Sequence, residues 1–251
     1  KYIYPYCFFK SNLQKIEFPD NSELLSIEEH AFSSTSIEMI TIPPHVTKIG
    51  EYAFEKCSKL RHVNFSNDSQ LRSIGKYAFS YTPIETITIP LHVIEIDEYA
   101  FEHCSKLRHV NFSNDSELRS IRGGAFVCTS IETITIPPHV TEIGNGAFSS
   151  CSRLRNVVFS DNSELRSIRG GAFNSTSIES ITIPPHVTEI GENAFSSCSA
   201  LRSVVFPSNS ELRSIGERAF QRTSIETIII PPHVFEIGEG AFPSNTIITR
   251  L

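Results

Sequence analysis

The sequence predicts a β-solenoid, in which short coils of chain stack side by side and share one core. Two observations predict this fold. The dipeptide Ala-Phe occurs ten times between residues 31 and 242, at intervals that alternate strictly between 22 and 25 residues. Each interval also contains apolar residues that alternate with polar ones, which is the periodicity of a strand. A segment this short cannot bury its apolar side alone, so we expect each coil to pack on its neighbours.

A short and a long unit together make a super-repeat of 47 residues. The short unit is typified by TSIETITIPPHVTEIGNGAF and the long unit by CSKLRHVNFSNDSQLRSIGKYAF. The long unit has two additional residues in its Ser-Asn-Asp-Ser turn and one before its strand. We expect about ten coils in one domain, 1–251: a divergent first coil over 1–31, regular alternating repeats over 32–242, and an incomplete last coil over 243–251.

Each unit is expected to contain the same elements in the same order. A strand comes first, with its apolar residues facing the core, as Ile134 and Ile136 do in one short unit. A Pro-Pro or Ser-Asn segment then ends the strand and turns the chain. A second apolar pair, such as Val140 and Ile143, covers the far side of the core. Ala-Phe forms the corner, either as a turn or as one helical or 3₁₀ turn.

The repeat resembles the leucine-rich repeats of the BspA-like (Treponema pallidum-type) family. The segment IETITIPPHVTEIGNGAFSSC at 131–151 is similar to the family pattern at each position, and the resemblance covers residues 8–247. The strict 22/25 alternation looks most similar to expanded surface-antigen sets of parasitic protozoa such as trichomonads. The resemblance implies a right-handed leucine-rich repeat solenoid with a parallel β-sheet on its concave face and short strands or turns on its convex side. It also implies a cell-surface or secreted adhesion protein.

A row of histidines follows the strands of the short units and raises the question of a metal site. The row consists of His45, His92, His139, His186 and His233. Neighbouring strands lie about 4.8 Å apart, so residues two coils apart are separated by about 10 Å. Ligands of one metal ion lie about 2 Å from it. We therefore expect the row to result from repetition, and we expect no metal and no other cofactor.

Four of the six cysteines share one position in the long units, and threonine takes that position in the short units. The cysteines are Cys57, Cys104, Cys151 and Cys198. Like residues in this column are about 10 Å apart, beyond the Cα separation of about 7 Å that a disulfide can bridge. We expect small, half-buried residues that bond a turn. Cys128 lies one residue outside the column, and a strained disulfide to Cys104 or Cys151 is the alternative.

Composition and motifs argue against several classes of function. The net charge of −6 disfavours a general nucleic-acid binder, and no apolar run is long enough to span a membrane. The sequence contains no G-x-S-x-G, no phosphate-binding glycine loop and no CxxC pair. An enzyme normally needs one constellation that departs from the repeat, and none is present. We therefore expect no enzymatic activity.

The second position of each strand segment alternates between glutamate and arginine along the chain. Opposite charges would then lie side by side in adjacent coils, where an exposed pair contributes about 0.2–1 kcal/mol. We interpret this column as structural, because like charges would disfavour the same stacking register. The column consists of Glu38, Arg61, Glu85, Arg108, Glu132, Arg155, Glu179, Arg202 and Glu226.

The third and fifth positions of the strand segments point away from the core and form the candidate ligand-binding face. In the first half of the chain these side chains are small, polar and uncharged, whereas the face becomes more apolar from Val158 onward. Such a face suits either an extended protein or glycan ligand or an ordinary solvated sheet rich in threonine. The candidate residues are His62, Asn64, Thr86, Thr88, His109, Asn111, Thr133, Thr135 and Asn156.

Two further features concern modification and assembly. Glycosylation sequons begin at Asn67 and Asn114 in turns and at Asn174, and also at Asn64 and Asn111 on strands. After Phe242 the chain begins another strand and stops. An uncapped coil leaves a strand edge exposed, so we expect either a shortened chain or a dimer contact at this coil.

The sequence as a whole favours a non-enzymatic recognition or adhesion module at the cell surface or outside the cell. Host or partner macromolecules, either proteins or glycans, would bind the concave repeat face. A rigid spacer or antigen scaffold that displays other regions and has no ligand of its own is the alternative.

Overall fold

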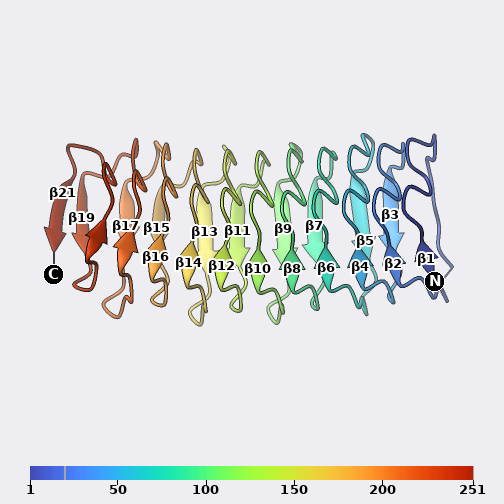
Figure 1. Ribbon diagram of the computed structural model, residues 1–251, viewed down its shortest axis with the longest axis horizontal. Helices are drawn as coiled ribbons and strands as arrows, with labels where there is room; N and C mark the ends of the chain where they lie inside the picture. Colours follow the sequence, from blue (N-terminus) through green and yellow to red (C-terminus); the bar gives the residue numbers. More distant parts are fainter. Residues whose placement is uncertain (20, 251) are drawn as a thin grey trace.

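The computed structural model describes residues 1–19 and 21–250, which form a parallel β-solenoid (Figure 1). Its coils lie in a row from the N-terminal end to the C-terminal end. One side of the stack is a continuous parallel sheet of eleven two-residue strands. These short strands are β1 (Tyr2–Ile3), β2 (Ser26–Ile27), β4 (Lys48–Ile49), β6 (Ser73–Ile74), β8 (Glu95–Ile96), β10 (Ser120–Ile121), β12 (Glu142–Ile143), β14 (Ser167–Ile168), β16 (Glu189–Ile190), β18 (Ser214–Ile215) and β20 (Glu236–Ile237).

The other side carries longer strands, and we call it the long-strand face. It corresponds to the face that the sequence predicts to be concave. Buried and exposed residues alternate along these strands, for example in β3 and β7. The long strands are β3 (Met39–Ile42), β5 (His62–Phe65), β7 (Thr86–Ile89), β9 (His109–Phe112), β11 (Thr133–Ile136), β13 (Asn156–Phe159), β15 (Ser180–Thr182), β17 (Ser203–Val205), β19 (Thr227–Ile230) and β21 (Ile247–Arg250).

Backbone pairing on the long-strand face repeats every two coils. Strands β3 and β5 pair over four residues, as do β7 with β9 and β11 with β13. Between these pairs the ladder opens: β5 and β7 pair only at His62 and Thr86, and β9 and β11 belong to different sheets. Each opening follows a long unit, so the structural period is the 47-residue super-repeat.

Stacked phenylalanine rings run through the whole core at the corners. Phe32 and its equivalents are buried, and successive rings lie 5.2–5.4 Å apart with nearly parallel planes, for example Phe126 with Phe148 and Phe173. The stack begins one coil earlier than the first Ala-Phe, because Phe8 stacks on Phe32 at 5.1 Å. There Cys7 takes the place of the corner alanine. The solenoid therefore has about eleven coils, and the first of them lies within the divergent coil expected over 1–31.

The corners themselves are turns, and the described residues contain no helix. Each corner places the residue before Ala-Phe, or its equivalent, in the left-handed region, with φ between +52° and +63°. This conformation costs little for glycine and about 1–2 kcal/mol for other residues. Gly124 satisfies it, and a Cβ there would clash with the ring of Tyr99. No helix in the described part of the chain is long and apolar enough to cross a membrane.

Candidate recognition surface

The two outward columns of the long-strand face form as the strand periodicity predicts. In the third-position column, His62 lies beside Met39 and Thr86, and Thr86 lies beside His109. In the fifth-position column, Thr88 lies beside Asn111. All nine candidate residues are exposed: His62, Asn64, Thr86, Thr88, His109, Asn111, Thr133, Thr135 and Asn156. Whether they contact a ligand stays a prediction.

The C-terminal part of the same face is apolar. Val158, Val205 and Ile229 occupy the fifth-position column and are 47%, 49% and 56% exposed. Thr182 lies between the two valines, because it pairs with Val205 in the ladder of β15 and β17. The face thus changes along the solenoid axis from hydrogen-bonding side chains to aliphatic ones, as the sequence indicates.

The alternating charge column places opposite charges in neighbouring coils but forms no close ion pairs among its own members. The backbone N–H of Arg61 donates to the carbonyl of Glu38 at 2.9 Å, and Arg108 and Glu85 do the same. Yet within residues 1–19 and 21–250 no carboxylate of the column lies within 4.0 Å of a guanidinium of the column. Glu132 instead lies 3.7 Å from Arg153. The column therefore acts through weak, solvent-screened attraction.

Three histidines of the row, His92, His139 and His186, brace neighbouring loops. Nδ1 of His92 lies 3.0 Å from Glu117, and Nδ1 of His139 lies 2.9 Å from Glu164, one coil further along the chain. The hydrogen bond from His92 holds the pKa of the Glu117 carboxyl below its usual value. No three His, Cys, Asp or Glu side chains of the described residues gather where they could hold a metal ion.

The Cys–Thr column bonds the corner turns from inside the core. The Sγ of Cys104 lies 3.3 Å from Oγ1 of Thr82 and donates to the carbonyl of Phe79 at 3.1 Å. Burial raises the pKa of the Cys104 thiol to about 12 and that of Cys151 to about 11. All six cysteines are free, so the alternative of a disulfide from Cys128 is not formed.

Sequence reasoning missed a second column of stacked rings at the outside of the first five corners. Tyr6, His30, Tyr52, Tyr77 and Tyr99 stack in order, with ring centroids 4.6–4.9 Å apart. Each of these residues immediately precedes Ala-Phe or its equivalent. Alignment of the repeat units therefore places these ring-bearing residues at one position. Two histidines near the corners, His30 and His103, also take part in ring stacking. His30 lies within this column, and His103 stacks on Tyr81 at 4.7 Å.

The family follows from comparison with known sequences. The pattern described as BspA type leucine-rich repeat region matches residues 1–108, 72–176 and 119–249. The chain belongs to this family. No protein with a curated description matches it significantly. The protozoan source suggested by the 22/25 alternation stays a prediction.

Several solved structures are similar to this leucine-rich repeat protein. A leucine-rich repeat protein from Bacteroides ovatus is 23% identical, with a TM-score of 0.54 over 98% of this chain and 80% of that one. The pneumococcal vaccine antigen PcpA is 18% identical, with a TM-score of 0.56 over 98% and 76%. A T. pallidum leucine-rich repeat protein is 21% identical, with a TM-score of 0.48 over 82% and 78%.

Proposed function

We propose that this chain is a non-enzymatic recognition module at the cell surface or outside the cell, and that it binds a protein or glycan of a host or partner through the long-strand face. The observation that carries the proposal is the pair of exposed polar columns in the first half of the long-strand face, of which His62, Thr86 and His109 are adjacent members. Repeated contacts of this kind give useful affinity by multivalency even where each is weak. The fold shared with a pneumococcal vaccine antigen supports the surface location.

A binding screen against extracellular-matrix proteins and a glycan array tests the proposal. The triple variant His62→Ala, Thr86→Ala and His109→Ala removes three neighbouring polar side chains and leaves the core intact. Since a hydrogen bond contributes about 0.5–1.5 kcal/mol, we expect affinity to fall by about tenfold or more. The matched control is Ser58→Ala, Ser105→Ala and Ser152→Ala, which changes three exposed serines in the turns after the cysteine column.

The two functional hypotheses give different results in this screen. The recognition module loses binding in the triple variant and keeps it in the serine control. A rigid spacer or antigen scaffold, which has no ligand of its own, shows either no binding to any probe or equal binding by both variants. Circular dichroism of each variant establishes that the solenoid is intact.

A further inference from the structure

Three open clefts lie where the long strands end, and they are the same cleft repeated every 47 residues. The first, second and third clefts have volumes of about 840, 920 and 410 Å³. Each contains a half-buried phenylalanine, a threonine, a proline and a serine from equivalent positions. These residues are Phe18, Thr41, Pro43 and Ser66 in the first cleft, Phe65, Thr88, Pro90 and Ser113 in the second, and Phe112, Thr135, Pro137 and Ser160 in the third.

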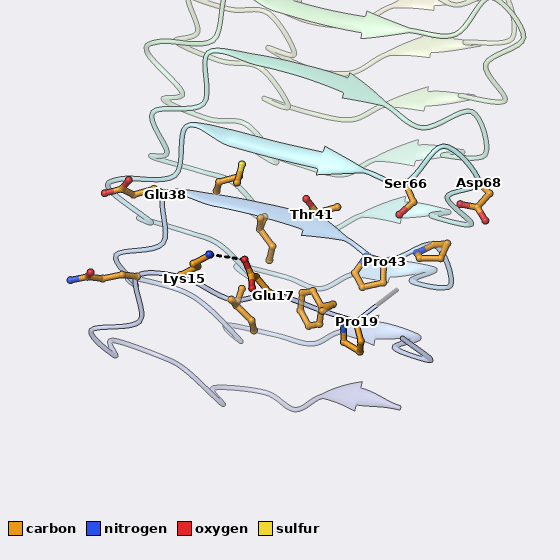
Figure 2. A pocket seen from close by; sticks show the side chains of 14 residues that line it. Lys15, Glu17, Pro19, Glu38, Thr41, Pro43, Ser66 and Asp68 are labelled. Atoms are coloured by element: carbon orange, nitrogen blue, oxygen red, sulfur yellow. Dashed lines mark ion pairs between the residues drawn. The ribbon is translucent and has the colours of Figure 1, made fainter. Parts of the chain in front are cut away.

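The unequal lengths of the two units produce these clefts. The loop of a long unit has two additional residues and projects, while the Pro-Pro loop of the short unit between two such loops is recessed. Figure 2 shows this arrangement in the first cleft, where Pro43 lies between Pro19 on one side and Ser66 and Asp68 on the other. The opened backbone ladder between β5 and β7, and between β9 and β11, leaves room at the same places.

The walls of the third cleft are held by local hydrogen bonds. The N–H of Ser116 closes the loop by donating to the carbonyl of Ser113 at 3.0 Å. The N–H of Glu164 donates to the carbonyl of Pro138 at 2.8 Å, and the Glu164 carboxylate lies 2.9 Å from His139. The recessed loop is therefore tied to the next projecting loop, and the cleft is formed before any ligand arrives.

The third cleft contains no ionisable side chain. Phe112 and the prolines give it an apolar floor, and amides and hydroxyls surround them. A ligand that presents C–H faces next to hydroxyl groups matches such a surface, because ring faces take the C–H groups and amides exchange hydrogen bonds with hydroxyls. Neutral sugars have this chemistry. The polar groups are Asn111, Asn114, Asn162, Ser113, Thr135 and Ser160.

The second cleft is similar, whereas the first is charged. The second adds the Asp68 carboxylate and the imidazoles of His62 and His92. The first contains Lys15 and Glu17, which form an ion pair at 2.6 Å, drawn as a dashed line in Figure 2. The second and third clefts therefore share a lining of amides and hydroxyls, and of the two only the third lacks ionisable side chains.

Equivalent points in neighbouring clefts are two strand spacings apart, or about 10 Å. An extended β-linked hexose chain repeats over a similar length with each disaccharide, which turns the same ring face to the same side. We propose that the second and third clefts bind a neutral linear polysaccharide, with one disaccharide in each cleft and the sugar chain along the solenoid axis. The proposal deepens the proposed recognition function and rests on it.

An extended proline-rich peptide is the competing ligand, since three polyproline residues also advance about 9 Å. Peptides of this kind dock on grooves lined by aromatic side chains. The second cleft contains Phe65 and Phe112 and the third contains Phe112, but in both clefts amides and hydroxyls outnumber the rings, which favours a ligand with many hydroxyl groups.

Titration calorimetry of the unglycosylated chain, produced in bacteria, tests the proposal. The probes are β-1,4-linked oligosaccharides of glucose, mannose and N-acetylglucosamine with two, four and six residues, a hyaluronan hexasaccharide, and a nonaproline peptide. For at least one neutral series, we expect the tetrasaccharide to bind about tenfold or more tightly than the disaccharide, because it reaches both clefts. Hyaluronan, which is anionic, should bind more weakly than the neutral probe of equal length.

Two equivalent substitutions locate the binding. Asn64→Ala alters the second cleft and Asn111→Ala the third, and each should reduce the tetrasaccharide affinity to about that of the disaccharide. Asn145→Ala, at an exposed corner residue outside the clefts, is the matched control and should change nothing. Phe112→Leu, which keeps apolar volume against the core, should weaken binding as well.

The outcomes separate this inference from the function on which it rests. Binding of a matrix protein that is lost in the His62, Thr86 and His109 variant, without binding of any neutral oligosaccharide, overturns the polysaccharide assignment and leaves the recognition function standing. Absence of binding to every probe in both experiments overturns both. Tight binding of nonaproline, or oligosaccharide binding that is indifferent to Asn64→Ala and Asn111→Ala, also overturns the assignment.

Discussion

Nδ1 of His186 lies 2.9 Å from Oε1 of Glu211, which is 25 residues further along the chain. The pair joins the recessed loop of a short unit to the projecting loop of the next long unit. The same contact recurs between His139 and Glu164, 47 residues earlier. A feature that suggested a metal site in the sequence is thus a repeated brace between coils.

This brace predicts a pH-dependent contribution to stability. The hydrogen bond to His186 lowers the pKa of Glu211 from 4.5, so the folded state favours the ionised carboxylate. The stability that this hydrogen bond contributes is present above the pKa of the carboxyl in the unfolded chain. It is lost as the pH falls through the pKa of the carboxyl in the folded chain. We expect Glu211→Gln to lower the urea midpoint at pH 7 and to have a progressively smaller effect below pH 4.5. Urea denaturation between pH 3 and pH 7 measures this, with Glu239→Gln as control. A difference between Glu211→Gln and the natural chain that does not change with pH would contradict the assignment.

Burial of the cysteine column predicts selective thiol reactivity. The thiolate is the reactive form, and burial raises the pKa of Cys104 to about 12. In the folded chain at pH 8 we expect iodoacetamide to label the exposed Cys7 first, the half-buried Cys128 more slowly, and the four column cysteines only after denaturation. Peptide mass spectrometry gives the order, and the denatured chain is the control. Labelling of Cys104 as fast as Cys7 would show that the column is accessible.

The phenylalanine stack predicts a large loss of stability on truncation. Phe126 is buried between Phe101 and Phe148, with ring centroids 5.2 and 5.3 Å away. Phe126→Ala should lower the free energy of unfolding by about 3–5 kcal/mol, through lost burial and the cavity left behind. Phe235→Ala is the matched control, because this ring is 76% exposed and should contribute almost nothing. Urea denaturation of both variants tests the difference, and equal midpoints would refute the role of the stack.

The fold could be predicted because every coil repeats the same physical requirements. A buried Ile143 and a corner Phe148 are needed in each coil, so their spacing appears directly in the sequence. The N-terminal corner belongs to the divergent first coil expected over 1–31, where Cys7-Phe8 replaces Ala-Phe. Cys7 is exposed at the end of the stack, so this position is less constrained than the buried corner alanines of the inner coils.

The outward columns could be predicted from the two-residue period of a strand, which places His62 and Asn64 on one face. Contacts between loops could not be predicted from this period. The approach of His139 to Glu164 depends on how two loops of unequal length fold across neighbouring coils. The ring column was missed for another reason: stacking depends on ring orientation, and histidine replaces tyrosine at His30. Prediction of the clefts would need both the strand periodicity and the way in which loops of unequal length fold across neighbouring coils.

The sequons predict unequal glycosylation in a eukaryotic secretory host. Asn67 and Asn114 are exposed in projecting loops and should carry glycan at high occupancy. Asn174 is half-buried at a corner, where its Oδ1 accepts a hydrogen bond from Ser175 at 2.8 Å, and should carry little. Glycopeptide mass spectrometry measures the three occupancies. Because Asn114 lines the third cleft, its glycosylation should also weaken oligosaccharide binding relative to bacterially produced chain. Full occupancy at Asn174 would contradict the ranking.

The alternating charge column predicts a small effect that depends on salt. Arg155 lies beside Glu132, to whose carbonyl its N–H donates at 3.0 Å, and Glu179 follows in the next coil. Arg155→Glu would place three carboxylates in adjacent coils, and we expect it to lower the free energy of unfolding by about 0.5–1 kcal/mol at low ionic strength. The loss should nearly vanish at about 1 M salt, where the screening length is about 3 Å.

Arg155→Gln, which only removes the charge, should cost less stability, and adding Glu132→Arg to Arg155→Glu should restore part of the loss. Urea denaturation of the natural chain and the three variants at low and high salt measures these free energies of unfolding. A loss of stability in Arg155→Glu that is unchanged by salt would show that Arg155 acts by packing rather than by its charge.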